Sequence, residues 1–499
     1  EQTNQVLAYL KAENEYTEAV LGHTEALQNK LYDEITGRIK QNDESVPYFK
    51  NGYWYYTRYK EGAEYPVYCR KYKSLESQEQ IMLDVNEMAE GLEYYDVSGL
   101  EVSPDNKILA YGEDTLSRRI YTIRFKNLET GEWLNDELVN ASAGGAWAKD
   151  NSTFFFTTKD RTTLLENKIW RHKLGRDQKS DVLVYEEPDN TFNIGVYNSK
   201  SNDYIIIYNQ STLTSDYHIL RADNPDGDFK QFTPRETPHE YGIEHFEDKF
   251  YILTNWDATN FRLMETAVSA TERSNWKEVI PHREQTLLDD IEVFKNFLVV
   301  QERSNALIQL RIINQQTGEQ HYMDFIEPAY VVYASTNAEF DTEMLRYGYS
   351  SLTTPNSTYD YNMRTKEQVL MKQQEIVGGH SPEGYQTERL FAESRDGTKI
   401  PITLVHKKGT SKDSSTPLLL YGYGSYGYSV DPWFNSSRLS LLDRGFIYAI
   451  AHIRGGQEMG RQWYEDGKLL NKKNTFYDYV DCAKFLIEEK NTSPAHLYA

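Results

Sequence analysis

The sequence predicts a seven-bladed β-propeller between a helical part and an α/β part, and three observations predict it. Between about residues 47 and 375, polar turns recur about every 45 to 55 residues, a period typical of four-stranded propeller blades. Residues 1–46 carry apolar side chains at helical spacing. From Glu388 onward, strands alternate with helices, which indicates a parallel-type sheet. We therefore expect a helical part at 1–46, a propeller at 47–378 and an α/β part at 379–499.

Each repeat begins with a polar turn pair such as Lys50-Asn51, followed by an aromatic or β-branched strand. A single blade leaves an apolar face uncovered, so neighbouring blades must stack and the ring must close. A different all-β arrangement, such as a sandwich, is the alternative. The seven predicted strands are 53–58, 107–111, 153–157, 204–208, 250–254, 297–300 and 344–349.

The last 120 or so residues contain paired strands and two helices. Asp396-Gly397 lies between two apolar runs, which predicts a hairpin. Gly445 follows one helical segment as a C-cap, and Thr475 and Asp478 have the spacing of a capping box at the start of the next. The predicted strands are 390–393, 400–406, 418–421 and 446–452, and the predicted helices are 436–443 and 475–490.

Composition excludes several classes of protein. The net charge of −22 argues against nucleic-acid binding and would attract cationic ligands, although solubility alone also accounts for it. No apolar run approaches the ~18 residues of a membrane helix, and no secretory h-region opens the sequence. Cys69 and Cys482 are predicted to be buried free thiols, which suits a reducing cytosol. We predict a cytoplasmic monomer that binds neither nucleic acid nor a membrane.

One glycine-rich loop invites a cofactor interpretation, which its surroundings argue against. Gly422, Gly424 and Gly427 match the spacing of a dinucleotide fingerprint after a strand. Those glycines should open a helix, yet the loop continues to Pro432. The sequence also lacks His-Glu-x-x-His and Cys-x-x-Cys motifs, so we expect no cofactor and no metal. The tyrosines of this loop suggest another use, because a phenolic hydroxyl can donate a hydrogen bond to charge developing on a carbonyl oxygen.

The local sequence does not identify a catalytic nucleophile or a catalytic base. No serine has glycine at both −2 and +2, the pattern of a nucleophile turn. His452 lies in a buried strand and is predicted to be a packed core histidine, whereas His406 ends a strand and is predicted to face solvent.

Four longer motifs carry a resemblance to a known family. They are Tyr-Gly-Tyr-Gly-Ser-Tyr-Gly from Tyr421, Arg-Leu-Ser-Leu-Leu-Asp-Arg-Gly from Arg438, Ile-Arg-Gly-Gly-Gln-Glu from Ile453 and Trp-Tyr-Glu-Asp-Gly-Lys from Trp463. The chain resembles the prolyl oligopeptidase family of serine peptidases over its whole length. The resemblance implies a seven-bladed β-propeller inserted in an α/β-hydrolase domain. It also implies that the hydrolase domain is incomplete here, because the family's catalytic serine, aspartate and histidine would follow the last residue.

The resemblance further implies an activity and a set of site residues. It implies hydrolysis of short peptides after Lys or Arg, with short basic peptides as substrates. Tyr423 matches the tyrosine that stabilises the oxyanion, and Asp431 matches an acid that binds a basic residue next to the cleaved one. Trp433 replaces that acid's partner and could stack on an Arg side chain. Arg454 and Glu458 match loop or interface positions. A proline-specific peptidase of the family and a non-catalytic propeller scaffold are the alternatives.

Overall fold

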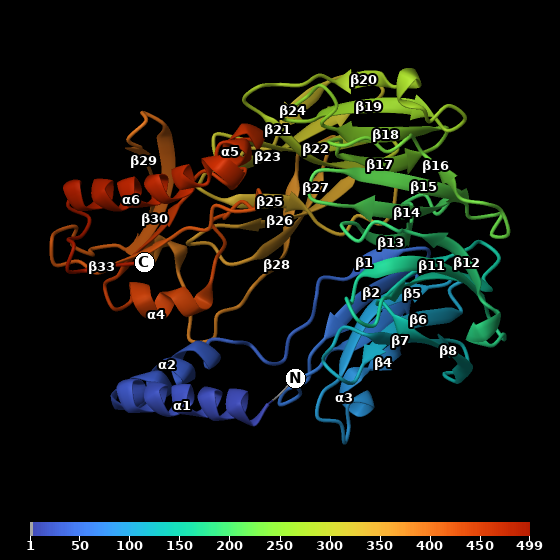
Figure 1. Cartoon of the computed structure of the whole chain (residues 1–499), viewed down its shortest axis with the longest axis horizontal. Helices are drawn as coiled ribbons and strands as arrows, with labels where there is room; N and C mark the ends of the chain where they lie inside the picture. Colours follow the sequence, from blue (N-terminus) through green and yellow to red (C-terminus); the bar gives the residue numbers. More distant parts are fainter. Residues whose placement is uncertain (1–2) are drawn as a thin grey trace.

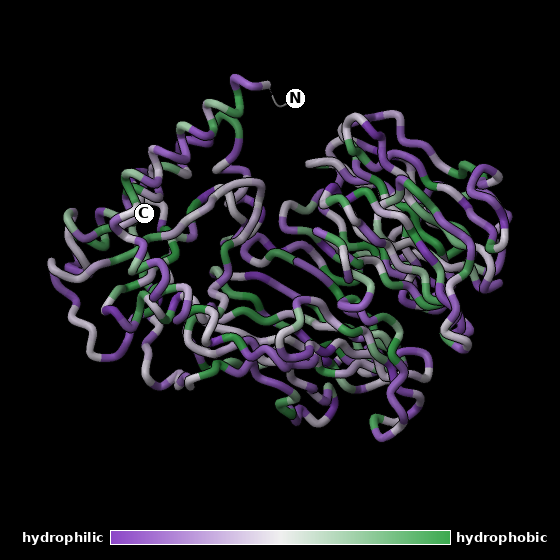
Figure 2. The backbone as a smooth tube through the Cα atoms, turned by 90° about the horizontal axis from the view of Figure 1, so that it is seen from below, coloured by the Kyte–Doolittle hydropathy of each residue, from purple (hydrophilic) through white to green (hydrophobic). Residues whose placement is uncertain are grey.

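The computed structural model describes residues 3–499 and places them in a propeller part and a C-terminal part that contains both helices and strands (Figure 1). Apolar residues gather inside both parts, whereas the connecting loops are mostly hydrophilic (Figure 2). Within the described residues, no helix is both long enough and apolar enough to cross a membrane.

Two helices precede the propeller, α1 (Asn4–Leu21) and α2 (Glu25–Thr36). The Thr3 hydroxyl accepts a hydrogen bond from the Val6 amide and so caps α1. Figure 1 shows both helices beside the C-terminal part, away from the propeller sheets. An ion pair of 2.8 Å between Glu34 and Arg444 connects α2 to that part of the molecule.

Five antiparallel sheets of the propeller have four strands each, in simple sequential order. The first contains β1 (Tyr48–Lys50), β2 (Tyr53–Arg58), β3 (Val67–Tyr72) and β4 (Glu79–Asp84), and α3 (Val85–Met88) follows it. The next two contain β13 (Asn193–Asn198), β14 (Tyr204–Gln210), β15 (Ser215–Arg221) and β16 (Lys230–Gln231), then β17 (Tyr241–Phe246), β18 (Lys249–Thr254), β19 (Arg262–Ala267) and β20 (Lys277–Ile280). The last two contain β21 (Leu287–Val293), β22 (Phe297–Ser304), β23 (Leu307–Asn314) and β24 (Gln320–Tyr322), then β25 (Val331–Ala334), β26 (Met344–Ser350), β27 (Ser357–Asn362) and β28 (Gln368–Gln373).

The remaining propeller strands form one eight-stranded sheet, so the prediction of seven blades is wrong. Ala141 at the end of β8 pairs with Thr158 of β10 and joins the two halves of this sheet. The physical reason is that β9 is short and covers only Phe154 and Phe155 of β10, which leaves an edge for β8. The strands are β5 (Asp96–Val102), β6 (Ile108–Asp114), β7 (Tyr121–Asn127), β8 (Trp133–Ala141), β9 (Ala146–Trp147), β10 (Thr153–Lys159), β11 (Glu166–Lys173) and β12 (Val182–Glu186).

The predicted strands themselves are present: the seven segments lie in β2, β6, β10, β14, β18, β22 and β26. These strands are rich in β-branched and aromatic residues because both of their faces are covered by neighbouring sheets. The first and last propeller sheets meet through side chains, since the Asn51 amide donates to Glu339 at 2.8 Å and Arg346 donates to the Pro47 carbonyl at 2.5 Å.

The C-terminal part is built on a mixed sheet in the order β29-β30-β32-β31-β33. Its helix α6 packs against one face through Cys482 and Leu486, and α4 packs against the other through Leu439 and Leu442. The predicted hairpin around Asp396 is confirmed as β29–β30. The elements are β29 (Tyr385–Glu393), β30 (Lys399–Lys407), β31 (Leu418–Tyr421), α4 (Leu439–Leu442), β32 (Ile447–Ala451), α5 (Arg461–Glu465), α6 (Lys473–Glu488) and β33 (Leu497–Tyr498).

Two expectations for this part need correction. The expectation of an incomplete hydrolase domain is not supported by these findings. The five strands form one sheet with a buried core against both α4 and α6. The predicted capping box is also wrong, since α6 begins after Lys472 and not at Thr475. Thr475 and Asp478 are both buried inside the helix and contact the loop after β32. The domain boundaries at residues 46 and 378 stay predictions.

Candidate functional site

Two glycine loops that follow neighbouring strands hold one another in place. Gly424 follows β31 and Gly455 follows β32, with φ angles of +60° and +108° that disfavour any side chain. A Cβ at Gly455 would lie 2.0 Å from the Gly424 carbonyl oxygen, and the Gly427 amide donates to the Gly455 carbonyl at 2.9 Å. The glycines therefore permit close backbone packing, and this contact fixes the loop that carries Tyr423.

Tyr423 lies on this loop with its side chain partly in solvent. It is 46% exposed, and its ring stands edge-on to Tyr428 at 5.7 Å between centroids. Lys472 supports the same loop by donating to the Ser425 hydroxyl at 2.7 Å and to the Gly424 carbonyl. An exposed phenolic hydroxyl on a fixed backbone can donate a hydrogen bond to a ligand oxygen.

Asp431 lies between the two parts of the molecule and already has a cationic partner. Its carboxylate accepts two hydrogen bonds from the Arg303 guanidinium of the propeller, at 2.6 and 3.1 Å. The Arg303 side chain is 6% exposed and that of Asp431 is 15% exposed, so the pair is largely shielded from water. The structure therefore places Asp431 in a two-pronged ion pair of the kind that favours arginine.

Trp433, two residues further on, also contacts the propeller. Its ring lies 5.5 Å from that of Tyr333 at an interplanar angle of 52°. The next amide, that of Phe434, donates to the Ser350 hydroxyl at 3.0 Å. The segment from Asp431 to Phe434 is therefore docked on β22, β25 and β26 rather than free in solvent.

Arg454 and Glu458 both follow β32, but they make contacts with different parts of the molecule. Arg454 bonds both carboxylate oxygens of Asp478 at 2.7 and 2.8 Å and reaches Asp396 at 2.7 Å, all within the C-terminal part. The Glu458 carbonyl accepts from the Ala306 amide of the propeller at 3.0 Å. Arg454 thus shapes its own loop, whereas Glu458 lies where the two parts meet.

The Glu458 carboxyl is buried beside this contact. It is 2% exposed and accepts a hydrogen bond from the Val430 amide at 2.8 Å. Burial raises its pKa to about 7, which Arg303 nearby only partly opposes. The group is therefore a buried acid that changes charge near neutral pH.

The wild-type protein is expected to become less stable as pH rises, because Glu458 must ionise while buried. We expect the Glu458→Gln variant not to show this decrease. The folded pKa is above the usual value near 4.5, so stability is full below that pH and falls between about 4.5 and 7. The loss is at most about 3 kcal/mol, and Gln keeps the acceptor for Val430. Urea unfolding from pH 4 to 8 measures it, with the exposed Glu13→Gln as control. Parallel pH curves for wild type and Glu458→Gln would contradict the assignment.

Sequence reasoning placed some residues correctly and missed others. His452 is confirmed as a core histidine: it is 2% exposed, contacts the Thr403 hydroxyl at 2.8 Å, and burial lowers its pKa to about 4. Cys69 and Cys482 are both buried free thiols, as predicted. The prediction for His406 is wrong, because it is 5% exposed and contacts Glu388 at 3.0 Å. Nothing in the local sequence around Arg303 indicated its role.

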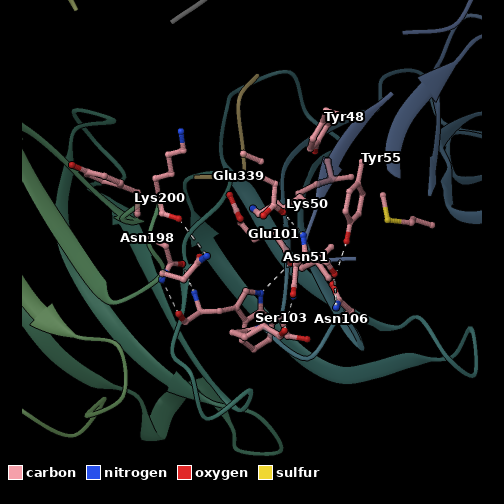
Figure 3. A pocket seen from close by; sticks show the side chains of 18 of the residues that line it. Tyr48, Lys50, Asn51, Tyr55, Glu101, Ser103, Asn106, Asn198, Lys200 and Glu339 are labelled. Atoms are coloured by element: carbon pink, nitrogen blue, oxygen red, sulfur yellow. Dashed lines mark hydrogen bonds between the residues drawn. The ribbon is translucent and has the colours of Figure 1, made fainter. Parts of the chain in front are cut away.

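A separate cavity lies inside the propeller. It has a volume of about 780 Å³ and none of the five sequence-predicted site residues lines it. Lys50 of β1, Glu101 of β5 and Lys200 after β13 surround it (Figure 3). Within residues 3–499, no group of three or more His, Cys, Asp and Glu side chains is placed to hold a metal ion.

Comparisons with known proteins agree over nearly the whole chain. The family model described as "Prolyl oligopeptidase, N-terminal beta-propeller domain" matches residues 1–374, and the model "Prolyl oligopeptidase family" matches residues 432–499. Dipeptidyl aminopeptidase BI of Pseudoxanthomonas mexicana is 45% identical, over 98% of this chain and 69% of that protein. Protease 2 of Moraxella lacunata is 34% identical, over 99% and 72%. The structure of oligopeptidase B from Leishmania major superposes with a TM-score of 0.93 at 33% identity, over 99% of this chain and 71% of that one.

Proposed function

This chain belongs to the prolyl oligopeptidase family of serine peptidases, and from that premise we propose that it hydrolyses short peptides on the carboxyl side of Lys or Arg. The proposal follows the likeness to oligopeptidase B and protease 2. We further propose that the protein is a cytoplasmic monomer whose substrates are short basic peptides.

The observation that carries the proposed preference for a basic cleaved residue is the likeness to oligopeptidase B, with a TM-score of 0.93 at 33% identity. The carboxylate of Asp431 belongs to the neighbouring position. It stands beside the tyrosine loop, and in this structure it holds a guanidinium by two hydrogen bonds. The net charge of −22 would in addition speed the approach of cationic peptides.

The chemistry proposed for the site is acyl transfer to a serine. In such a reaction a histidine takes the serine proton, an aspartate orients that histidine, and hydrogen-bond donors stabilise the tetrahedral oxyanion. We assign the serine, histidine and aspartate to no residue of this sequence. We assign the donor to the Tyr423 hydroxyl, because the packed glycine loops fix its backbone while leaving its side chain accessible.

Replacing Tyr423 by phenylalanine is expected to lower kcat by about 10²- to 10³-fold with little change in KM, because the lost donor acts on the transition state. The ring and its contact with Tyr428 are retained, so folding should be unaffected. Steady-state kinetics on an Arg-amide substrate measure the effect, with the exposed Tyr426→Phe on the same loop as the matched control. Equal kcat for Tyr423→Phe and the control would remove Tyr423 from the mechanism.

Access to the site is proposed to limit substrate size. The propeller contacts the segment from Asp431 to Phe434 through Arg303, Tyr333 and Ser350, so a peptide must enter between the two parts. Short or unfolded chains could do this, whereas folded proteins could not. The proposal predicts that a folded protein with exposed lysines resists cleavage and that short peptides of the same sequence with an internal lysine do not.

A panel of fluorogenic amides tests the proposed specificity. The intact protein is expected to cleave amides of Arg and Lys with a much higher kcat/KM than amides of Pro or Ala. Preference for the Pro amide would favour a proline-specific peptidase, and no hydrolysis of any amide would favour a propeller that serves as a binding scaffold. Inhibition by a serine-directed phosphonyl fluoride checks the nucleophile class.

A second candidate function is removal of dipeptides from a free amino terminus. The 45% identity to a protein named dipeptidyl aminopeptidase BI favours it. Two substrates with the same Arg amide distinguish the candidates, one with a free amino-terminal dipeptide and one with its amino terminus acetylated. An endopeptidase cleaves both, whereas a dipeptidyl aminopeptidase requires the free amine.

A further inference from the structure

The turn between β22 and β23 is anchored on the C-terminal part by three kinds of contact. The Ala306 amide donates to the Glu458 carbonyl at 3.0 Å, and Arg389 donates to the Asn305 carbonyl at 2.5 Å. Arg303, at the end of β22, bonds Asp431. Because Glu458 holds both the turn after Arg303 and the Val430 amide before Asp431, the Arg303 guanidinium is presented to Asp431 in a fixed position.

Asp431 uses both carboxylate oxygens for this one partner. The two N–H···O bonds of 2.6 and 3.1 Å join different guanidinium nitrogens to different carboxylate oxygens, which is an arrangement a free arginine side chain would adopt on the same carboxylate. The other acid near Arg303, Asp289, is 3.9 Å away and therefore a weaker partner. Asp431 is thus the main partner of Arg303.

An internal guanidinium competes strongly with any that arrives from solution. Tethering a group next to its partner gives an effective concentration in the millimolar range or above. A peptide at micromolar concentration would have to displace Arg303 from a site that is largely closed to water. The neighbouring Trp433, which could stack on a cationic side chain, contacts Tyr333 in a tilted arrangement.

We propose that Arg303 is a specificity-determining residue that occupies Asp431 and so selects against a basic side chain next to the cleaved residue. The inference rests on the proposed function, because it assumes that Asp431 faces the peptide at that position. It narrows that function: the enzyme cleaves at single basic residues without favouring pairs of them. Removing the Arg303 guanidinium is expected to expose Asp431 and create a preference for paired basic residues.

The test uses the intact protein with Arg303→Met, Asp431→Asn and the double variant, and a peptide mixture that varies both the cleaved residue and the residue before it. Arg303→Met is expected to raise the preference for Arg over Ala at the preceding position by about tenfold in kcat/KM. The double variant is expected to return to the wild-type ratio. An unchanged ratio in Arg303→Met, or a gain that persists in the double variant, would overturn the proposal.

A control variant and a second measurement keep the test valid if a variant folds poorly or is inactive. Arg311→Met removes another buried arginine of the same sheet, one that pairs with Glu302, and should leave the ratio unchanged. Ethylguanidinium at millimolar concentration is expected to raise the Tm of Arg303→Met by filling the vacated place on Asp431. It should not raise the Tm of wild type or of the double variant. Equal responses of Arg303→Met and the double variant would also overturn the proposal.

The same mixture separates this inference from the function on which it rests. Absence of a Lys or Arg preference at the cleaved residue contradicts the proposed function. The comparison of Arg with Ala at the preceding position is made separately, with whichever residue is cleaved best. If no peptide is cleaved, the proposed function and the selectivity inferred from it both fail, and the ethylguanidinium measurement then reports only whether Arg303 occupies Asp431.

Discussion

Replacing Arg454 by methionine is expected to lower the free energy of unfolding by about 3–5 kcal/mol, because the change leaves the Asp478 carboxylate buried without its charged partner. Asp478 is fully buried in α6 and receives the Arg454 amide at 3.1 Å as well as two guanidinium bonds. Arg454 also precedes Gly455, so losing its anchor should loosen the loop packed against Gly424. Urea unfolding at pH 7 measures the change.

A matched control is an arginine that pairs with another aspartate of the same helix. Arg395 pairs with Asp481 at 2.9 Å, but its side chain is 45% exposed, so Arg395→Met should have a much smaller effect on stability. The Asp478→Asn change in the Arg454→Met background should recover part of the loss, because the unpaired charge is gone. If Arg454→Met and Arg395→Met were equally mild, burial of Asp478 would not govern the stability of this loop.

Much of the propeller could be predicted from the sequence because its strands repeat a local pattern. Aromatic and β-branched runs after polar turns identify strands such as β10 and β22 without any knowledge of their neighbours. The count of blades depended on a non-local event. A single residue pair, Ala141 with Thr158, joins eight strands, and it forms because β9 contains only two residues. No periodicity in the sequence reports that pairing.

In the candidate site, too, local motifs were predictable from the sequence and long-range contacts were not. The glycine and tyrosine motif located Tyr423, and motif resemblance located Asp431. The partner of Asp431 was not predictable, because Arg303 lies 128 residues earlier and on the other part of the molecule. For Thr475 and Asp478, the local sequence predicted a contact that does not form. Their spacing satisfies a capping rule, but Asp478 instead accepts hydrogen bonds from Arg454, which stabilise the adjoining loop. Tertiary contacts therefore decided both outcomes.

Replacing His172 by phenylalanine is expected to destabilise the eight-stranded sheet by about 3–5 kcal/mol. The imidazole of His172 is fully buried on β11, with its two nitrogens 2.7 Å from Asp181 and 3.1 Å from Asp136. Both carboxylates are also shielded from water, so the histidine is the group that compensates their charge. Phenylalanine fills a similar volume, which confines the effect to the lost polar contacts.

The pH dependence separates an ionic role of His172 from simple packing. Burial alone would lower its pKa, but the bonds to Asp181 and Asp136 outweigh burial, and the pKa is raised above the usual 6.5. A raised folded pKa means that the stabilisation is full below about pH 6.5 and declines as pH rises through the folded value. The difference in unfolding free energy between wild type and His172→Phe should therefore shrink from pH 6 to pH 9. His321→Phe, which removes only a hydrogen bond to the Tyr361 hydroxyl, serves as the control. A difference that stays constant over this range would show that His172 stabilises the sheet as a neutral side chain.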